Sequence, residues 1–121
     1  MIRLRGPWEV EPPTAAADAI PPESRGVIRF NRRFGSPTGL QPNDEVDLVF
    51  EGISSTALVW LNDALLGELA PPEPARFGIL PQLKARNVLL VEVRSPEAID
   101  SKRVPEFADF VREVRLEILA R

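Results

Sequence analysis

The sequence predicts an all-β fold built as a two-sheet antiparallel β-sandwich, and three observations lead to this prediction. Thirteen prolines in 121 residues divide the chain into short pieces, and proline breaks a helix interior. Several of these pieces alternate apolar and polar residues, which is the pattern of a strand with one buried face. No stretch has the apolar spacing of an amphipathic helix of three turns. Two stacked sheets are the simplest arrangement that buries strands of this kind.

The first part of the chain holds two expected strands and a long connection. Residues 8–11 (WEVE) alternate apolar and charged side chains and predict a short strand. Residues 12–24 are rich in proline and alanine, so we expect an extended connection, with a helical turn at 15–19 as the alternative. Residues 26–34 predict a strand with two distinct faces. Its expected inner residues are Ile28, Phe30 and Phe34, and its expected outer residues are Arg29, Asn31 and Arg33.

The middle of the chain predicts a strand followed by a hairpin. Residues 45–53 alternate well enough to indicate a strand, and residues 35–44 before them are dense in turn-forming types. Residues 56–61 are apolar on both faces, which favours a central strand covered on both sides, with Trp60 packed in the core. Asn62–Asp63 then predicts a two-residue hairpin turn, because both residue types tolerate a positive φ.

The last third predicts two further clear strands. Residues 75–80 read as a weak strand that a turn at 81–86 follows. Residues 87–94 predict a strand with Leu89, Val91 and Val93 on one face. Residues 95–110 are polar and irregular, with a possible helical turn near 96–100, and residues 111–119 alternate again to the end of the chain.

Composition excludes several functional classes. The size suits one domain, residues 1–121. The net charge of −3 and the scattered basic residues disfavour nucleic-acid binding. Without Cys or His, the chain lacks the usual nucleophile, general base and zinc ligands. No apolar run suggests a signal peptide or a membrane span, so we expect a cytoplasmic protein without membrane contact. We also expect no cofactor and no metal, since the carboxylates of Asp44, Glu45, Asp47 and Glu51 lack the loop spacing of a calcium site.

Five segments, taken in order, give the chain a family resemblance. These are GVIRFNRRF, EVDLVFEGI, ALVWLNDALLG, FGILPQLKARNVLLVEV and VREVRLEIL. Together they resemble the N-terminal sugar-binding domain of glycoside hydrolase family 2, the β-galactosidase and β-glucuronidase group. The third segment departs from the family pattern at Asp63, where a glycine is usual. The resemblance implies a galactose-binding-like jelly-roll sandwich.

The resemblance implies a non-catalytic module, because the catalytic carboxylates of that family lie in a separate barrel domain. The expected function is therefore a carbohydrate-binding-like role, without enzyme activity. The alternative is a structural or protein-interaction sandwich, partnered by another protein or by its own copy, that has lost sugar binding. The absence of Tyr and a short loop before Val111 favour this alternative.

Four residues are candidate ligand contacts. The resemblance implies Asp109, since the family has an Asp followed by an aromatic residue in a loop that shapes the sugar pocket; the present loop is shorter, and a solvated loop aspartate is the alternative. Trp8 offers an aromatic face suited to a sugar ring, with core packing as its alternative. Asn31 and Arg33 project from one strand face and could bind hydroxyls, or form an ordinary solvated face.

Overall fold

The computed structural model describes residues 2–10, 27–94 and 107–119. The expected connection at 12–24, with its alternative helical turn, lies outside the described residues. So does the part of the expected irregular loop that covers 95–106. Within the described ranges, no helix is long and apolar enough to cross a membrane.

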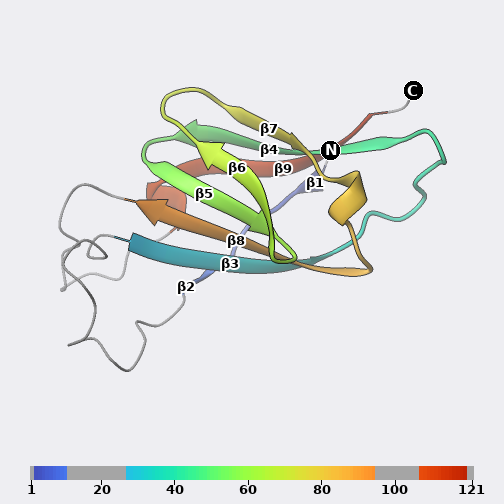
Figure 1. The fold of residues 1–121 in the computed structure, drawn as a ribbon, viewed down its shortest axis with the longest axis horizontal. Coiled ribbons are helices and arrows are strands. Elements are labelled where there is room, and N and C mark those ends of the chain that lie inside the picture. The colour runs from blue at the N-terminus through green and yellow to red at the C-terminus, as the bar shows by residue number, and fades with distance from the viewer. Residues whose placement is uncertain (1, 11–26, 95–106, 120–121) are drawn as a thin grey trace.

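The described residues form nine strands and two short 3₁₀ helices (Figure 1). The strands are β1 (Ile2–Arg3), β2 (Glu9–Val10), β3 (Val27–Gly35), β4 (Glu45–Ile53), β5 (Thr56–Leu61), β6 (Ala64–Leu69), β7 (Ala75–Gly78), β8 (Arg86–Arg94) and β9 (Val111–Leu119). The 3₁₀ helices are η3 (Leu80–Gln82) and η4 (Phe107–Asp109). Pairing is antiparallel throughout.

Two sheets share these strands. One has four strands in the order β1-β9-β4-β7, and the other has five in the order β2-β3-β8-β5-β6. From β3 onward the chain changes sheet at nearly every connection, so neighbours in sequence mostly face each other across the core. The predicted all-β, two-sheet antiparallel jelly-roll sandwich is confirmed.

The core lies between the two sheets and contains the residues that alternation assigned to it. The largest fully buried side chains are Phe30, Phe50, Leu48, Leu61, Leu69, Ile79, Leu89, Leu116, Val46, Val59, Val91 and Val93. Phe34, which was expected beside Phe30, is partly buried and packs against this cluster. The strands therefore bury one face as a period-two pattern requires.

Gly52 changes the alternation at the end of β4. Strict alternation from Phe50 would turn Ile53 outward, yet Ile53 is 5% exposed and belongs to the core. Gly52 has a φ of 69°, a left-handed conformation that side chains rarely adopt. A Cβ at this position would also collide with the Cβ of Arg112 on the opposing strand. Glycine is thus required for Ile53 to face inward.

The predicted turn at Asn62–Asp63 is confirmed, with positive φ at both residues. The Asn62 side chain also forms hydrogen bonds to residues of η3 and β8. Its Nδ2 donates to the carbonyl of Gln82 at 2.8 Å, and its Oδ1 accepts from the amide of Val88 at 2.9 Å. It also donates to Oδ1 of Asn87, a residue only 1% exposed. Asn62 is therefore a structural residue that joins the hairpin to β8 and η3.

Three predictions about elements need correction. Trp60 was expected in the core, but it lies on the outer face of β5, half-buried and outside the core cluster. A strand with apolar residues on both faces can be buried on both sides, or it can expose one apolar face to solvent. The sequence alone does not distinguish these two cases. The strand expected at 75–80 ends at Gly78, because η3 begins at Leu80. β1 was not predicted at all, because it contributes only two residues to its sheet.

Candidate functional site

A hollow of about 600 Å³ opens at the edge of the sandwich where the chain crosses between the sheets. β1 is the edge strand of the four-stranded sheet and β2 the edge strand of the other, so residues 4–8 bridge the two edges. The opposite wall is η4 and the first half of β9. The polar and aromatic lining comes from Arg3, Arg5, Trp8, Phe107, Arg112 and Glu113.

An aromatic cluster forms the floor of this hollow. The ring of Trp8 stacks on Phe107 with centroids 3.8 Å apart and an interplanar angle of 12°. Phe107 in turn meets Phe30 edge-on at 5.4 Å, which connects the cluster to the core. Trp8 is half-buried. Since Phe107 covers one face of the Trp8 ring, a ligand has only the opposite ring face for stacking.

Arginines give the hollow a positive character. Arg3 forms an ion pair with Glu113 at 3.1 Å. Arg5 and Arg112 are exposed, and neither side chain forms an ion pair with any other residue that the structure describes. Three arginines thus face one glutamate in the lining. Among the described residues, the guanidinium groups of Arg5 and Arg112 thus have no carboxylate partner, and guanidinium binds carboxylates in bidentate fashion.

Arg32 holds the wall of the hollow in place. Its Nε donates to the carbonyl of Arg5 at 2.6 Å, and its Nη1 donates to the carbonyl of Arg33 at 3.1 Å. Partial burial lowers the pKa of the Arg32 guanidinium. The amide of Leu4 donates to the carbonyl of Val114 at 2.8 Å and fixes the other end of the segment.

The predicted site residues fall in two separate places. Trp8 lines the hollow, and Asp109 ends η4, whose first two residues also line it. The side chain of Asp109 lies outside the described residues. Asn31 and Arg33 lie elsewhere, on the outer face of β3, because Asn31 pairs with Glu9 and Leu90 while the inward Phe30 pairs with Val10 and Val91.

Sequence reasoning missed Arg3, Arg5 and Arg112 as members of the hollow. Arg3 and Arg5 lie about a hundred residues before Arg112 in the chain, and the pairing of β1 with β9 brings them together. The alternation of charge and apolar residues in IRLR is the local signal that could have identified β1 as a strand. Nothing in that alternation indicates β9 as its partner.

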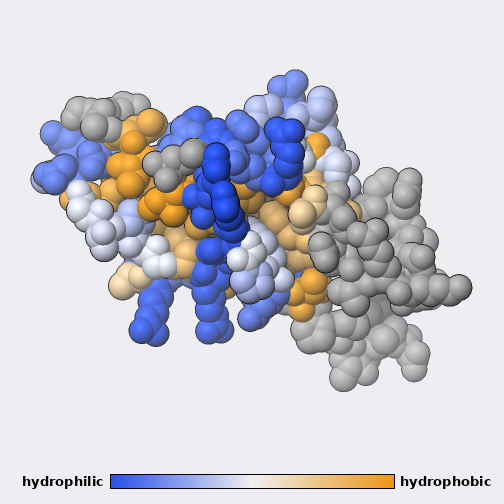
Figure 2. All heavy atoms as spheres, turned by 180° about the vertical axis from the view of Figure 1, so that it is seen from behind, coloured by the Kyte–Doolittle hydropathy of each residue, from blue (hydrophilic) through white to orange (hydrophobic). Residues whose placement is uncertain are grey.

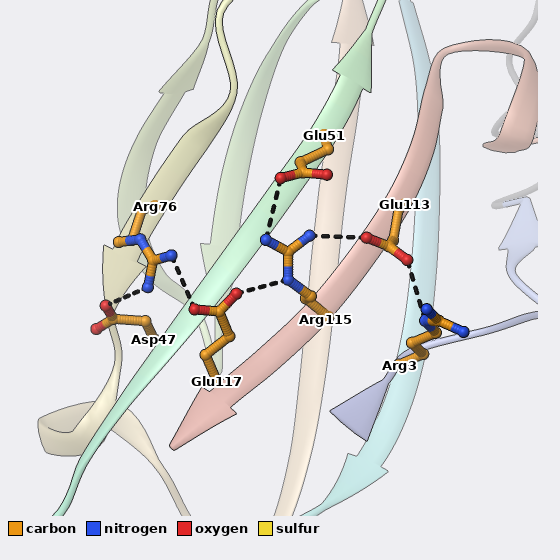
Figure 3. A network of polar contacts seen from close by, with 7 residues as sticks. All are labelled: Arg3, Asp47, Glu51, Arg76, Glu113, Arg115 and Glu117. Atoms are coloured by element: carbon orange, nitrogen blue, oxygen red, sulfur yellow. Dashed lines mark hydrogen bonds and ion pairs between the residues drawn. The ribbon is translucent and has the colours of Figure 1, made fainter. Parts of the chain in front are cut away.

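The outer face of the four-stranded sheet carries a network of ion pairs (Figure 3). Arg115 lies at its centre and bonds Glu51 at 3.0 Å, Glu113 at 2.7 Å and Glu117 at 2.6 Å. Its side chain is only 12% exposed. Arg76 continues the network, bonding Glu117 at 2.8 Å and Asp47 at 2.9 Å. Seen from behind, hydrophilic residues cover much of the middle of the molecule (Figure 2).

The network shifts the pKa values of its members. Hydrogen bonds from Arg115 lower the pKa of Glu51 and of Glu117, and Arg76 lowers that of Glu117 further. The same bonds raise the pKa of Arg115, with Glu51 as the largest contributor. Hydrogen bonds to Asp47 and Glu117 raise the pKa of Arg76. These carboxylates are thus engaged with arginine. Among the described residues no group of three or more acidic side chains could hold a metal ion.

The fold and the hollow define a class of protein: a jelly-roll sandwich of the galactose-binding type with a ligand-sized depression at its edge. Solved structures that are similar to the chain include glycoside hydrolases. The chain matches the β-glucuronidase of Bifidobacterium dentium, complexed with coumarin-3-O-glucuronide, at 26% identity and a TM-score of 0.59, over 76% of this chain and 19% of that one.

Two further structures match nearly the whole chain. The FMN-binding β-glucuronidase of Facaelibacterium prausnitzii L2-6 has 18% identity and a TM-score of 0.69, over 98% of this chain and 22% of that one. The β-D-glucuronidase of Dictyoglomus thermophilum has 14% identity and a TM-score of 0.67, over 99% and 28%. The resemblance to the N-terminal domain of glycoside hydrolase family 2 is confirmed by these similarities in fold.

The chain spans only 19% to 28% of the length of these three hydrolases. No family model matches the sequence, and no curated protein matches it either. The similarity therefore shows that this chain shares the fold of one domain of such enzymes.

Proposed function

We propose that this chain is a non-catalytic carbohydrate-binding module and that its ligand is an acidic sugar bound in the hollow. The observation that carries the proposal is the lining itself, an aromatic ring beside two exposed arginines, Arg5 and Arg112, that form no ion pair with another described residue. Aromatic faces suit the apolar face of a pyranose ring, and guanidinium groups suit a carboxylate. The fold supports the same role, since it is shared with enzymes that act on glucuronides, whose sugar carries a carboxylate.

The lining also supports a role without catalysis. Glycoside hydrolysis uses two carboxyl groups at a defined separation. Among the described residues that line the hollow, Glu113 is the one carboxylate, and it is already bound by Arg3 and Arg115. A single carboxylate that already binds two arginines does not supply the pair of carboxyl groups that hydrolysis uses.

Calorimetric titration with glucuronic acid and glucose tests the proposal. These sugars differ in a carboxylate at one position, so we expect glucuronic acid to bind more tightly. Arg112→Gln should weaken glucuronic acid binding roughly tenfold, because a charge-assisted hydrogen bond contributes about 1.5 kcal/mol or more. Arg112 is exposed and forms no ion pair with another described residue, so the variant should fold normally.

Arg33→Gln is the matched control. Arg33 is also an exposed arginine, but it lies on the outer face of β3. We expect this variant to bind glucuronic acid like the parent chain. Absence of binding to both sugars contradicts the proposal. A loss of binding in Arg33→Gln, with Arg112→Gln unaffected, would move the site from the hollow to the sheet face.

A further inference from the structure

The outer face of the five-stranded sheet carries an apolar patch that the sugar site does not use. The outer patch consists of Leu58, Trp60, Leu65, Val88 and Leu90. Strand register places Trp60 between Leu90 on β8 and Leu65 on β6, so the side chains are contiguous. Leu65 is 60% exposed and Val88 is 43% exposed. A contiguous exposed apolar surface of this kind marks an interaction site.

Opposite charges flank the outer patch on its two sides. On the β3 side stand Arg33 and Arg29, the latter in an ion pair with Glu92 of β8 at 3.1 Å, and on the β6 side stands Glu68, which pairs with Leu58. Arg33 and Glu68 are exposed, and neither forms an ion pair with another described residue. Asp63 in the hairpin turn adds a second exposed acid on the β6 side. The outward charges are therefore basic along β3 and acidic along β6, and Arg33 and Glu68 are the exposed charges without an ion pair to another described residue.

We infer that the outer patch is the contact surface between two copies of this chain, packed face to face about a twofold axis parallel to the strands. This axis places β3 of one protomer over β6 of its partner. Arg29 then lies opposite the partner's Glu68, and Arg33 opposite the partner's Asp63. A twofold axis across the strands would instead place β3 over β3 and oppose like charges. The flanking charges thus select one orientation of an isologous interface.

The size of the face sets the expected strength of this contact. Four strands spaced about 4.8 Å apart and six residues long give a face of roughly 20 Å by 20 Å. This face of roughly 400 Å² is about half of the 800 Å² that a standard specific interface buries on each partner, which places the contact in the weak, transient class. We therefore expect a weak dimer that forms between about 10 μM and 1 mM protein.

Sedimentation velocity over that concentration range tests the interface. We expect the sedimentation coefficient to rise from the monomer toward the dimer value. Leu65→Lys should hold the protein in the monomeric state, because strand register places this position opposite the partner's Asn31, between two arginines of β3. Leu80→Lys is the control, since Leu80 is 42% exposed on η3 and not on the sheet; it should dimerise normally. A parent chain that stays monomeric, or a Leu65→Lys variant that still dimerises, overturns the inference.

Two charge reversals test the orientation. With the axis parallel to the strands, Glu68→Lys faces the partner's Arg29, and Arg33→Glu faces the partner's Asp63, so each should weaken the dimer several-fold. With the axis across the strands, the same reversals would create attractive pairs and strengthen it. Strengthening in either variant contradicts the proposed arrangement. Glucuronic acid binding should be unchanged in both, which separates this interface from the sugar site.

Discussion

The outer faces of the two sheets differ in what they leave open to a partner. On the four-stranded sheet, Arg115 and Arg76 bind every carboxylate of the network around them. On the five-stranded sheet, Trp60 and Leu65 present apolar surface instead. The first face satisfies its polar groups internally, so a partner would have to displace ion pairs. The second gains free energy whenever apolar surface is covered.

The difference arises from residue choice at the outward positions of each strand. In β4 and β9 these positions are mostly charged, and antiparallel register sets acidic residues opposite each other, Asp47 with Glu117 and Glu51 with Glu113. Arg115 and Arg76 lie on either side of Val49 and bridge these carboxylates diagonally. Val49, an outward residue of β4, pairs with both Arg115 and Arg76 and is still only 3% exposed. In β5 and β8 the outward positions include Leu58, Trp60 and Leu90, which no described element covers. The same sandwich thus has one closed face and one open face.

Removing Arg115 should have the largest effect on stability. Arg115→Leu leaves Glu51, Glu113 and Glu117 close together without their shared cation, and we expect a loss of about 2 kcal/mol in the free energy of unfolding. Urea denaturation measures it. Arg86→Leu is the control, because Arg86 is exposed at the start of β8. Equal stability of the two variants would show that the network contributes nothing beyond a surface arginine.

Acid should weaken the closed face selectively. The pKa values of Glu51 and Glu117 lie below their ordinary value of 4.5 in the folded protein. Their contribution is present above pH 4.5 and is lost as the pH falls through the lower folded pKa values. At pH values below 4.5 we expect the Tm of the parent chain to decrease, and the Tm of Arg115→Leu to decrease by less. Parallel acid profiles for these two proteins would contradict the role of Arg115, and Arg86→Leu should follow the parent chain.

Changes on the open face should have the smallest effect on the stability of the monomer. Leu65→Thr alters a side chain that is 60% exposed, and threonine suits a strand. We expect the free energy of unfolding at low protein concentration to change by less than about 0.5 kcal/mol. Chemical denaturation at about 1 μM, below the expected dimer range, measures it. A loss comparable to that of Arg115→Leu would mean that Leu65 belongs to the folded core.

Much of the sandwich could be predicted from the sequence because alternation is a local signal. Phe30, Phe50 and Val91 are buried as their strands' patterns require. The turn at Asn62–Asp63 was likewise readable from two residues. Trp60 was misplaced for a physical reason: an apolar residue on the second face of a strand looks the same whether the fold covers it or a partner does.

The candidate site could be predicted only in part. Trp8 and Asp109 were singled out, and both belong to the segments that form the hollow. Arg5 and Arg112 were not, since their proximity depends on the pairing of β1 with β9. Strand pairing across almost the whole chain leaves no pattern in a single sequence. Non-local contacts of this kind become visible only once the fold is known.

The two tryptophans of the chain provide the most direct test, since they report on the two proposed surfaces. In a ¹⁵N-edited NMR spectrum each gives one indole N–H signal, and Trp60→Phe assigns them. When glucuronic acid is added at fixed protein concentration, we expect the Trp8 signal to shift until the site is saturated and the Trp60 signal to stay unchanged. When the protein concentration is raised without sugar, we expect the Trp60 signal to shift. A Trp8 signal that ignores the sugar, or a Trp60 signal that follows it, would contradict the assignment of sugar binding to the hollow.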